Sequence, residues 1–201
     1  MILGLPNRYF PKRTVGCPCF VLFPDTFLDR SLKSRACLNN SESVVILTGG
    51  HNDAAGPGVN STNGLLLSKK HWLSLPAIPF PHTRHGAAVC CGQLYVVGGK
   101  TSAPMCTFNP KQNKWIAHEK ELTTRLHCSV TALNELLYVM GGHRHWDRVD
   151  KYDPTLDEWT EVATMKTGRA SHCAVAMGTL FMSLVVVILM SAINLLSVLI
   201  P

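Results

Sequence analysis

Histidine and cysteine pairs are the residues of this chain whose spacing could support chemistry. His143 and His145 could offer two imidazoles to a metal ion, but no third ligand stands at helical or hairpin spacing, so we predict a solvated loop and no metal site. Cys90 and Cys91 could form a redox pair. Because adjacent residues of a strand point to opposite faces, we predict instead that both fill buried space.

Sequence motifs of common enzymes are missing. The chain contains no phosphate-binding GxxxxGK[ST], no HExxH and no GxSxG. Its glutamates at 119, 121 and 135 fall in polar turns, where we expect them to be solvated. We therefore predict that the chain is not an enzyme and holds neither a cofactor nor a metal.

The charge pattern argues against a nucleic-acid interface. The net charge is +6, from 19 basic and 13 acidic residues, and no basic run exceeds two residues. Nucleic-acid binders concentrate positive charge on one face or stripe, which is not seen here. The eight cysteines include no CxxC pair, and most stand in apolar segments. We therefore expect reduced thiols and a cytoplasmic protein.

Three groups of residues recur with a period of about 43. Apolar runs end in glycine doublets that are 49 and then 43 residues apart, the tryptophans are 43 and 44 apart, and the arginines are 41 and 44 apart. The doublets are Gly49–Gly50, Gly98–Gly99 and Gly141–Gly142, the tryptophans are Trp72, Trp115 and Trp159, and the arginines are Arg84, Arg125 and Arg169. A shared period indicates a structural repeat.

Each repeat has the composition of a small sheet. Turn pairs such as Asn109–Pro110 and Asp153–Pro154 separate short apolar runs, which predicts about four strands a unit. The aromatic residue seven positions before the tryptophan is Tyr152 in one unit and Phe108 in another. Four-stranded sheets repeated every 40–50 residues are typical of a β-propeller.

The doublets, the Tyr152 and Trp159 pair and the three arginines resemble the kelch repeat of kelch-like proteins, over roughly residues 43 to 181. In the first unit, Leu66 and Leu67 lie near the expected tyrosine. The resemblance implies an all-β fold, an incomplete propeller of about three to four four-stranded blades. We expect units near 43–80, 81–121 and 122–164, a partial unit at 165–181, and a linker or domain remnant at 1–42. Since kelch propellers commonly have six blades, we expect a fragment, a truncated product or a chain that pairs with another.

The resemblance also implies a function in protein recognition. Arg84, Arg125 and Arg169 would line the mouth of the central channel and bind an acidic peptide; alternatively, they pair with the backbone of a neighbouring blade. We expect the substrate-recognition propeller of an adaptor for a cullin–RING ubiquitin ligase, with cullin bound through a domain that residues 1–42 are too short to form. The alternative is a kelch protein that binds actin. A copper oxidase of the galactose oxidase kind is disfavoured, because three of the four tyrosines have structural places.

The C-terminal segment is apolar. Its only polar members between 180 and 200 are Ser183, Ser191, Asn194 and Ser197, and this length spans a bilayer as a helix. One interpretation of the 182–201 tail is a membrane anchor that leaves the kelch part in the cytosol, since Lys166 and Arg169 precede it. The other is sequence from read-through or a frameshift, which interrupts the fourth unit.

Overall fold

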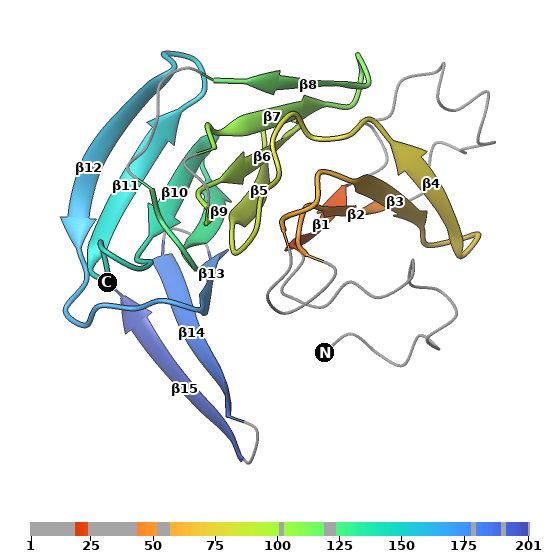
Figure 1. Cartoon of the computed structure of the whole chain (residues 1–201). Coiled ribbons are helices and arrows are strands. Elements are labelled where there is room, and N and C mark those ends of the chain that lie inside the picture. Colours follow the sequence, from red (N-terminus) through yellow and green to blue (C-terminus); the bar gives the residue numbers. More distant parts are fainter. Residues whose placement is uncertain are drawn as a thin grey trace.

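The computed structural model describes residues 19–23, 44–51, 57–100, 103–118, 124–177, 180–189 and 192–200. Every regular element in these ranges is a β-strand, and the strands form four antiparallel sheets that follow one another along the chain (Figure 1). The predicted all-β fold is confirmed, and the arrangement is that of an incomplete propeller.

Each sheet is a simple meander, with neighbouring strands also consecutive in the sequence. The first sheet contains β1 (Cys19–Phe23), β2 (Val44–Thr48), β3 (Thr62–Leu66) and β4 (His71–Leu75). The second contains β5 (Gly86–Cys90), β6 (Gln93–Val97), β7 (Cys106–Asn109) and β8 (Lys114–Ala117). The third contains β9 (Ser129–Leu133), β10 (Leu136–Met140), β11 (Arg148–Asp153) and β12 (Glu158–Thr164). The fourth contains β13 (His172–Met177), β14 (Leu180–Leu189) and β15 (Ala192–Ile200).

The outer hairpins use the predicted Asx–Pro turns. Asn109 Oδ1 accepts hydrogen bonds from the backbone N–H groups of Lys111 and Gln112, at 3.0 and 3.2 Å. Asp153 Oδ1 does the same for Thr155 and Leu156. These side chains replace backbone partners that the chain loses when it reverses, and so they fix the register of β7 on β8 and of β11 on β12.

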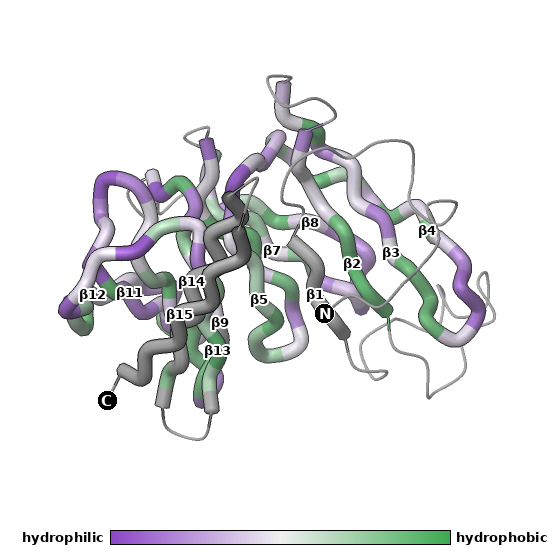
Figure 2. The backbone as a smooth tube through the Cα atoms, turned by 90° about the horizontal axis from the view of Figure 1, so that it is seen from below, coloured by the Kyte–Doolittle hydropathy of each residue, from purple (hydrophilic) through white to green (hydrophobic). Residues whose placement is uncertain are grey.

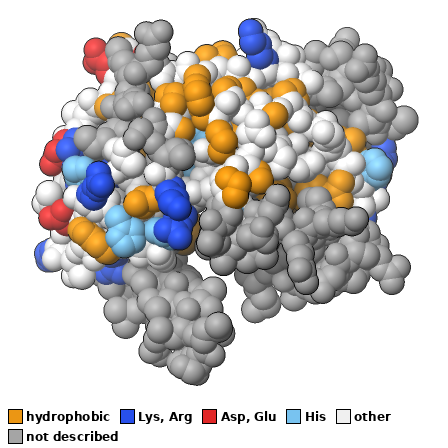
Figure 3. Space-filling view, viewed as in Figure 1, with side chains coloured by type: hydrophobic (Ala, Val, Ile, Leu, Met, Phe, Trp, Pro, Cys, Tyr) orange, Lys and Arg blue, Asp and Glu red, His pale blue; other side chains and the backbone are white. Residues whose placement is uncertain are grey.

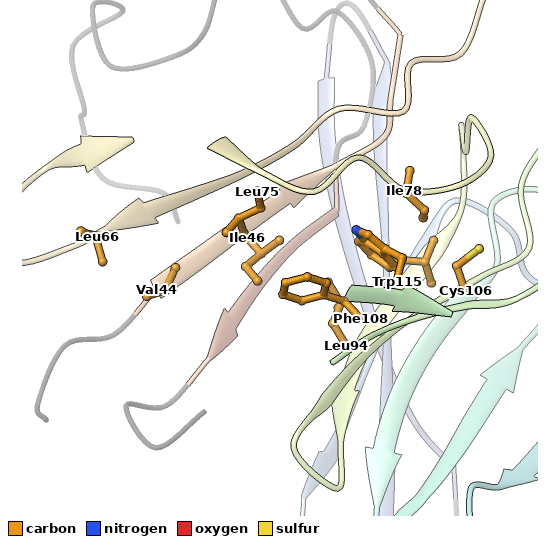
Figure 4. Packing of buried hydrophobic residues seen from close by; sticks show 10 residues of the cluster. Val44, Ile46, Leu66, Leu75, Ile78, Leu94, Cys106, Phe108 and Trp115 are labelled. Atoms are coloured by element: carbon orange, nitrogen blue, oxygen red, sulfur yellow. The ribbon is translucent and has the colours of Figure 1, made fainter. Parts of the chain in front are cut away.

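Alternation along the strands divides the core between two sides of each sheet. In β6, Leu94 and Val96 pack toward the first sheet, whereas Tyr95 and Val97 pack toward the third. Figure 4 shows Phe108 and Trp115 of the second sheet pointing toward Ile46 and Ile78. Figure 2 shows hydrophobic colour along β2, β5 and β9 and hydrophilic colour around the ends of β4 and β12. The second and third sheets therefore each pack against a neighbour on both sides.

The glycine doublets are where one sheet meets the loop of the next. Gly50, Gly99 and Gly142 donate their backbone N–H groups to the carbonyls of His82, Arg125 and Arg169, at 2.8, 2.9 and 2.8 Å. Gly98 has a φ of +73°, and a Cβ there would lie 2.5 Å from the Arg125 carbonyl oxygen. Only glycine satisfies both constraints. We call this loop carbonyl resting on a Gly–Gly pair the doublet contact.

Residues 19–23 belong to the first sheet, and not to a linker. β1 pairs with β2 over five residues, from Cys19 opposite Thr48 to Phe23 opposite Val44. The predicted boundary at residue 42 therefore separates this strand from its own sheet. Other parts of 1–42 lie outside the described residues.

The C-terminal segment forms strands, so the expectation that it is helical is wrong. β14 pairs with β13, and β15 pairs with β14 from Phe181 opposite Ile200 to Leu189 opposite Ala192. The β-branched run at 185–188 favours a strand, and β13 offers an edge on which it can pair. Among the described residues, no helix has the length and apolar character needed to cross a membrane.

We predict that Gly98→Ala lowers the free energy of unfolding by about 2 kcal/mol or more, because a Cβ at positive φ is strained and also meets the Arg125 carbonyl. Gly64→Ala is the control: there the Cβ would meet only the side chains of Val44 and Leu75, at 3.2 and 3.3 Å. Urea denaturation of the two variants measures the difference. Equal losses would contradict the doublet contact as the origin of the effect.

Candidate functional site

The three predicted arginines do not occupy equivalent positions. The doublet contacts align His82, Arg125 and Arg169, which are 43 and 44 residues apart, like the tryptophans. Arg84 stands two residues later, and its counterparts are His127 and Ser171, which share its positive φ at 58°, 58° and 53°. The alignment of arginines by residue type was therefore wrong in the first unit, because side-chain identity differs there while the backbone repeats.

Arg125 is fully buried and bound within the protein. Its guanidinium pairs with Asp150 and donates to the carbonyls of Val139, Gly141 and Arg148. Burial lowers the pKa of Arg125, and the Asp150 carboxylate opposes this shift. These contacts join the loop before β9 to β10 and β11. Of the two alternatives for the arginines, the geometry of Arg125 fits the structural one, with the partners in its own sheet.

Arg169 is also buried, with 8% of its surface exposed. Its backbone N–H donates to the Trp146 carbonyl at 2.6 Å, and its carbonyl accepts from Gly142. Arg84, in contrast, is exposed. Of the three, only Arg84 presents its side chain to solvent.

A group of exposed and half-buried side chains surrounds the loops at the doublets. The His127 and His143 rings lie 5.3 Å apart, and the His143 and Trp146 rings 4.5 Å apart, measured between centroids. Trp146 keeps 47% of its surface exposed. Arg84 accepts a hydrogen bond at its carbonyl from the His127 N–H, at 2.9 Å. We call Arg84, His127, His143 and Trp146 the histidine–tryptophan cluster.

Cationic and aromatic groups thus share one surface. Burial lowers the pKa of His127, and the nearby Arg84 and His143 lower it further. His127 is consequently neutral at pH 7 in the free protein. On the face shown in Figure 3, His, Lys or Arg and hydrophobic side chains gather beside the loop after β10. Such a surface suits an anionic ligand that also carries apolar groups.

His143 and His145 do not form a metal site with any third ligand in the described part of the chain, where no three His, Cys, Asp or Glu side chains come together. The prediction of a simple solvated loop missed that His143 packs against His127 and Trp146. Trp146 stands outside the tryptophan period, and His127 lies in the loop before β9, whereas His143 lies in the loop between β10 and β11. No sequence signal brings them together, because the contact depends on how two loops meet.

The periodic tryptophans face an equivalent residue in each sheet. Trp72 lies opposite Leu65, Trp115 opposite Phe108, and Trp159 opposite Tyr152. Leu65, and not Leu66 or Leu67, thus stands where the repeat has its aromatic residue. Trp115 is buried between the first two sheets and donates from Nε1 to the Pro76 carbonyl at 2.8 Å.

Cys90 and Cys91 do not point to opposite faces. Their sulfur atoms lie 3.7 Å apart, because β5 ends at Cys90 and Cys91 begins a turn with a φ of +47°. The strand rule on which the prediction rested does not extend into the turn. Cys90 itself is buried, with 3% of its surface exposed.

Comparison with known proteins confirms the resemblance to kelch repeats. The family model described as the Kelch motif matches residues 124–166, which cover the third sheet. Kelch-like protein 23 of Mus musculus is 29% identical over 106 residues, which are 50% of this chain and 19% of that protein. Kelch-like protein 33 of Homo sapiens is 32% identical over 131 residues, 59% and 25% of the two chains. Kelch repeat and BTB domain-containing protein 1 of camelpox virus (strain CMS) is 24% identical over 138 residues, 64% and 24%. The chain thus spans about a quarter or less of the length of these relatives.

We predict that Asp150→Asn destabilises the fold by about 3–5 kcal/mol, because it leaves the buried Arg125 charge without its counter-ion. Asp150 also pairs with Arg148, as does Glu161, whose side chain is 51% exposed. The control is therefore Glu161→Gln, which removes the exposed carboxylate of the two. That change should cost about 1 kcal/mol or less. Thermal and urea unfolding measure both. A similar small effect for the two variants would refute the structural role of the Arg125–Asp150 pair.

Proposed function

We propose that this chain of kelch repeats is a protein-interaction module that binds an acidic segment of a partner protein through the histidine–tryptophan cluster. The observation that carries the proposal is the cluster itself: an exposed guanidinium, two imidazoles and a half-exposed indole on adjoining loops of a β scaffold. Binding residues are common on loops that a rigid sheet positions.

The chemistry of the cluster favours protein over small-molecule recognition. Trp and Arg are enriched among the residues that dominate binding at protein interfaces. Trp146 offers an apolar surface, while Arg84 offers several N–H donors in the planar arrangement that carboxylates fit. A peptide with carboxylates next to an apolar side chain would use both groups at once.

The loops that carry the cluster are fixed before any ligand arrives. The His127 N–H donates to Arg84, the Ser171 N–H to His127, and the His143 N–H to Leu126, at 2.9, 2.9 and 2.8 Å. These bonds run from one sheet to the next and also within the third. A surface ordered in the free protein loses less conformational entropy on binding.

The finer function that we propose is substrate recognition for a cullin–RING ubiquitin ligase. Its support is the similarity to kelch-like proteins and to a camelpox protein whose name joins kelch repeats to a BTB domain. We also propose a cytoplasmic location. Its support is that five of the described cysteines, at 90, 91, 106, 128 and 173, are free thiols, as is usual in reducing compartments.

We predict that Arg84→Ala, His127→Ala and Trp146→Ala each weaken binding of a fluorescein-labelled peptide of alternating Glu and Leu about tenfold, which corresponds to about 1.4 kcal/mol. Fluorescence anisotropy at low salt measures the affinity. His127 is neutral in the free protein, and a bound carboxylate would stabilise its protonated form. The affinity of the wild type should therefore rise as the pH falls from about 7.5 to 5.5, and His127→Ala should reduce this dependence.

Two substitutions on outer turns serve as controls for that measurement. Lys111→Ala removes an exposed charge and Leu156→Ala an exposed apolar side chain, and neither residue is part of the cluster. Both should bind like wild type. Unchanged affinity in all three cluster variants would contradict the proposed site.

The adaptor function predicts a specific set of partners in cells. A tagged chain should be found in the soluble fraction, and pull-down of the full-length protein should recover cullin and a BTB partner. If the pull-down recovers no cullin and the protein co-sediments with actin filaments, the adaptor role is refuted in favour of a cytoskeletal one. Retention in the membrane pellet after alkaline carbonate extraction would contradict the cytoplasmic location.

A further inference from the structure

We propose that Cys90 and Cys91 form a redox-active dithiol, in which a hydroperoxide oxidises Cys91 and the two adjacent residues then close a reversible disulfide. The two sulfur atoms already lie 3.7 Å apart. This dithiol is separate from the histidine–tryptophan cluster, so the proposal does not rest on the proposed function.

The turn between β5 and β6 creates this contact. Cys91 and Gly92 are its two central residues, with φ values of +47° and +75°. Two-residue hairpins of this kind favour Asn or Asp before Gly, and the matching turn of the third sheet has Asn134 with a φ of +51°. A cysteine at such a position has no advantage for the turn, since side chains other than Asn, Asp and Gly are disfavoured there. Its sulfur, however, is brought back over Cys90.

Accessibility sets the order of the two steps. Cys91 is exposed, whereas Cys90 is buried with 3% of its surface exposed. A hydroperoxide therefore reaches Cys91 first. Burial, followed by the neighbouring Cys91, raises the pKa of Cys90 to about 12, so Cys90 is protonated and does not compete with Cys91 for the oxidant.

The chemistry balances with hydrogen peroxide as the oxidant. The Cys91 thiolate attacks one peroxide oxygen, the O–O bond breaks, and Cys91 becomes a sulfenic acid as the first water leaves. The Cys90 sulfur then attacks the Cys91 sulfur, an S–S bond forms, and the S–O bond breaks. The hydroxyl group leaves with the Cys90 proton as the second water. Two thiols thus supply the two electrons that reduce the peroxide.

A disulfide at this place should be easily reduced. The Cα atoms of adjacent residues are about 3.8 Å apart across a trans peptide, which is less than the range of about 4.4–6.8 Å usual for disulfides. Strained disulfides have more oxidising potentials and are the labile ones. The pair therefore suits a reversible modification, and not a permanent cross-link.

Oxidation would also change a contact between two sheets. The Cys91 thiol donates to the Glu135 carbonyl at 3.6 Å, and Glu135 lies in the β9–β10 turn of the third sheet. A disulfide has no S–H group and loses this donor. The contact is at the ends of β5 and β9 that lie away from the doublets, so ligand binding at the cluster and oxidation of the pair can be measured independently.

Mass spectrometry of the full chain tests the proposal directly. Trypsin cleaves after Arg84 and Lys100, and the peptide 85–100 contains no cysteine other than these two. After hydrogen peroxide and iodoacetamide, this peptide should lose two hydrogens and carry no alkyl group. Dithiothreitol should restore two alkylatable thiols. A peptide that gains oxygen, or that is alkylated at both cysteines after oxidation, would overturn the proposal.

Two comparisons separate a dithiol from general thiol reactivity. In Cys90→Ser, Cys91 has no partner and should proceed to sulfinic acid, which dithiothreitol does not reverse. Cys173 is the internal control, because it is equally a free, exposed thiol but has no adjacent cysteine. Reversible oxidation confined to the pair supports the proposal. Reversible oxidation of Cys91 in the Cys90→Ser variant, by the same mass shift, would contradict it.

Discussion

The doublet contact is the interaction on which the rest of the structure depends. At three places, the carbonyl of a loop residue accepts a hydrogen bond from the second glycine of the preceding sheet, at Gly50, Gly99 and Gly142. The approach is so close that a Cβ on the first glycine would collide with the same carbonyl. Because the loop leads directly into the first strand of the next sheet, this one contact sets where the second, third and fourth sheets begin. The apolar side chains between the sheets then add stability without having to specify the spacing.

The same contact explains how the candidate site is formed. Arg125 joins the doublet of the second sheet through its carbonyl and the third sheet through its guanidinium, which pairs with Asp150. The chain continues from Arg125 along the same loop to His127, and Gly142 leads to His143. Both histidines are therefore placed by backbone constraints of the repeat, while their side chains are free to differ from unit to unit. The scaffold repeats, and the surface that it presents does not.

Sequence could predict whatever the repeat imposes on the backbone. Glycine doublets recur because the carbonyl contact demands glycine, and Trp115 and Trp159 recur because their rings pack against the core. Arg84 misled the alignment because residue type was taken as a marker of position, whereas His82 holds the place of Arg125. β1 was missed because 20 residues separate it from β2. A membrane-spanning helix was one of two interpretations of the apolar tail, because length and hydrophobicity alone do not distinguish a helix from a buried strand. The contact of His143 with His127 and Trp146 had no signal, because it arises only when two loops are brought together.

The fourth sheet departs from the rule that orders the first three. Val185 of β14 lies opposite His172 of β13. The residue of the third sheet that is equivalent to Val185 is Gly141, where an added Cβ would lie 3.0 Å from the ring of His172. β14 continues as a strand through 185 and 186 to Leu189, twice the length of β10. The doublet contact requires a positive φ and the absence of a Cβ. A residue in a strand has a negative φ, and valine has a Cβ, so Val185 meets neither requirement. On the outer side of β13, Val175 is 45% exposed, whereas Ala88, its counterpart in the second sheet, is buried against the third sheet. Any sheet that packs on this surface must consequently do so through side chains, without the backbone contact that fixes the spacing of the others.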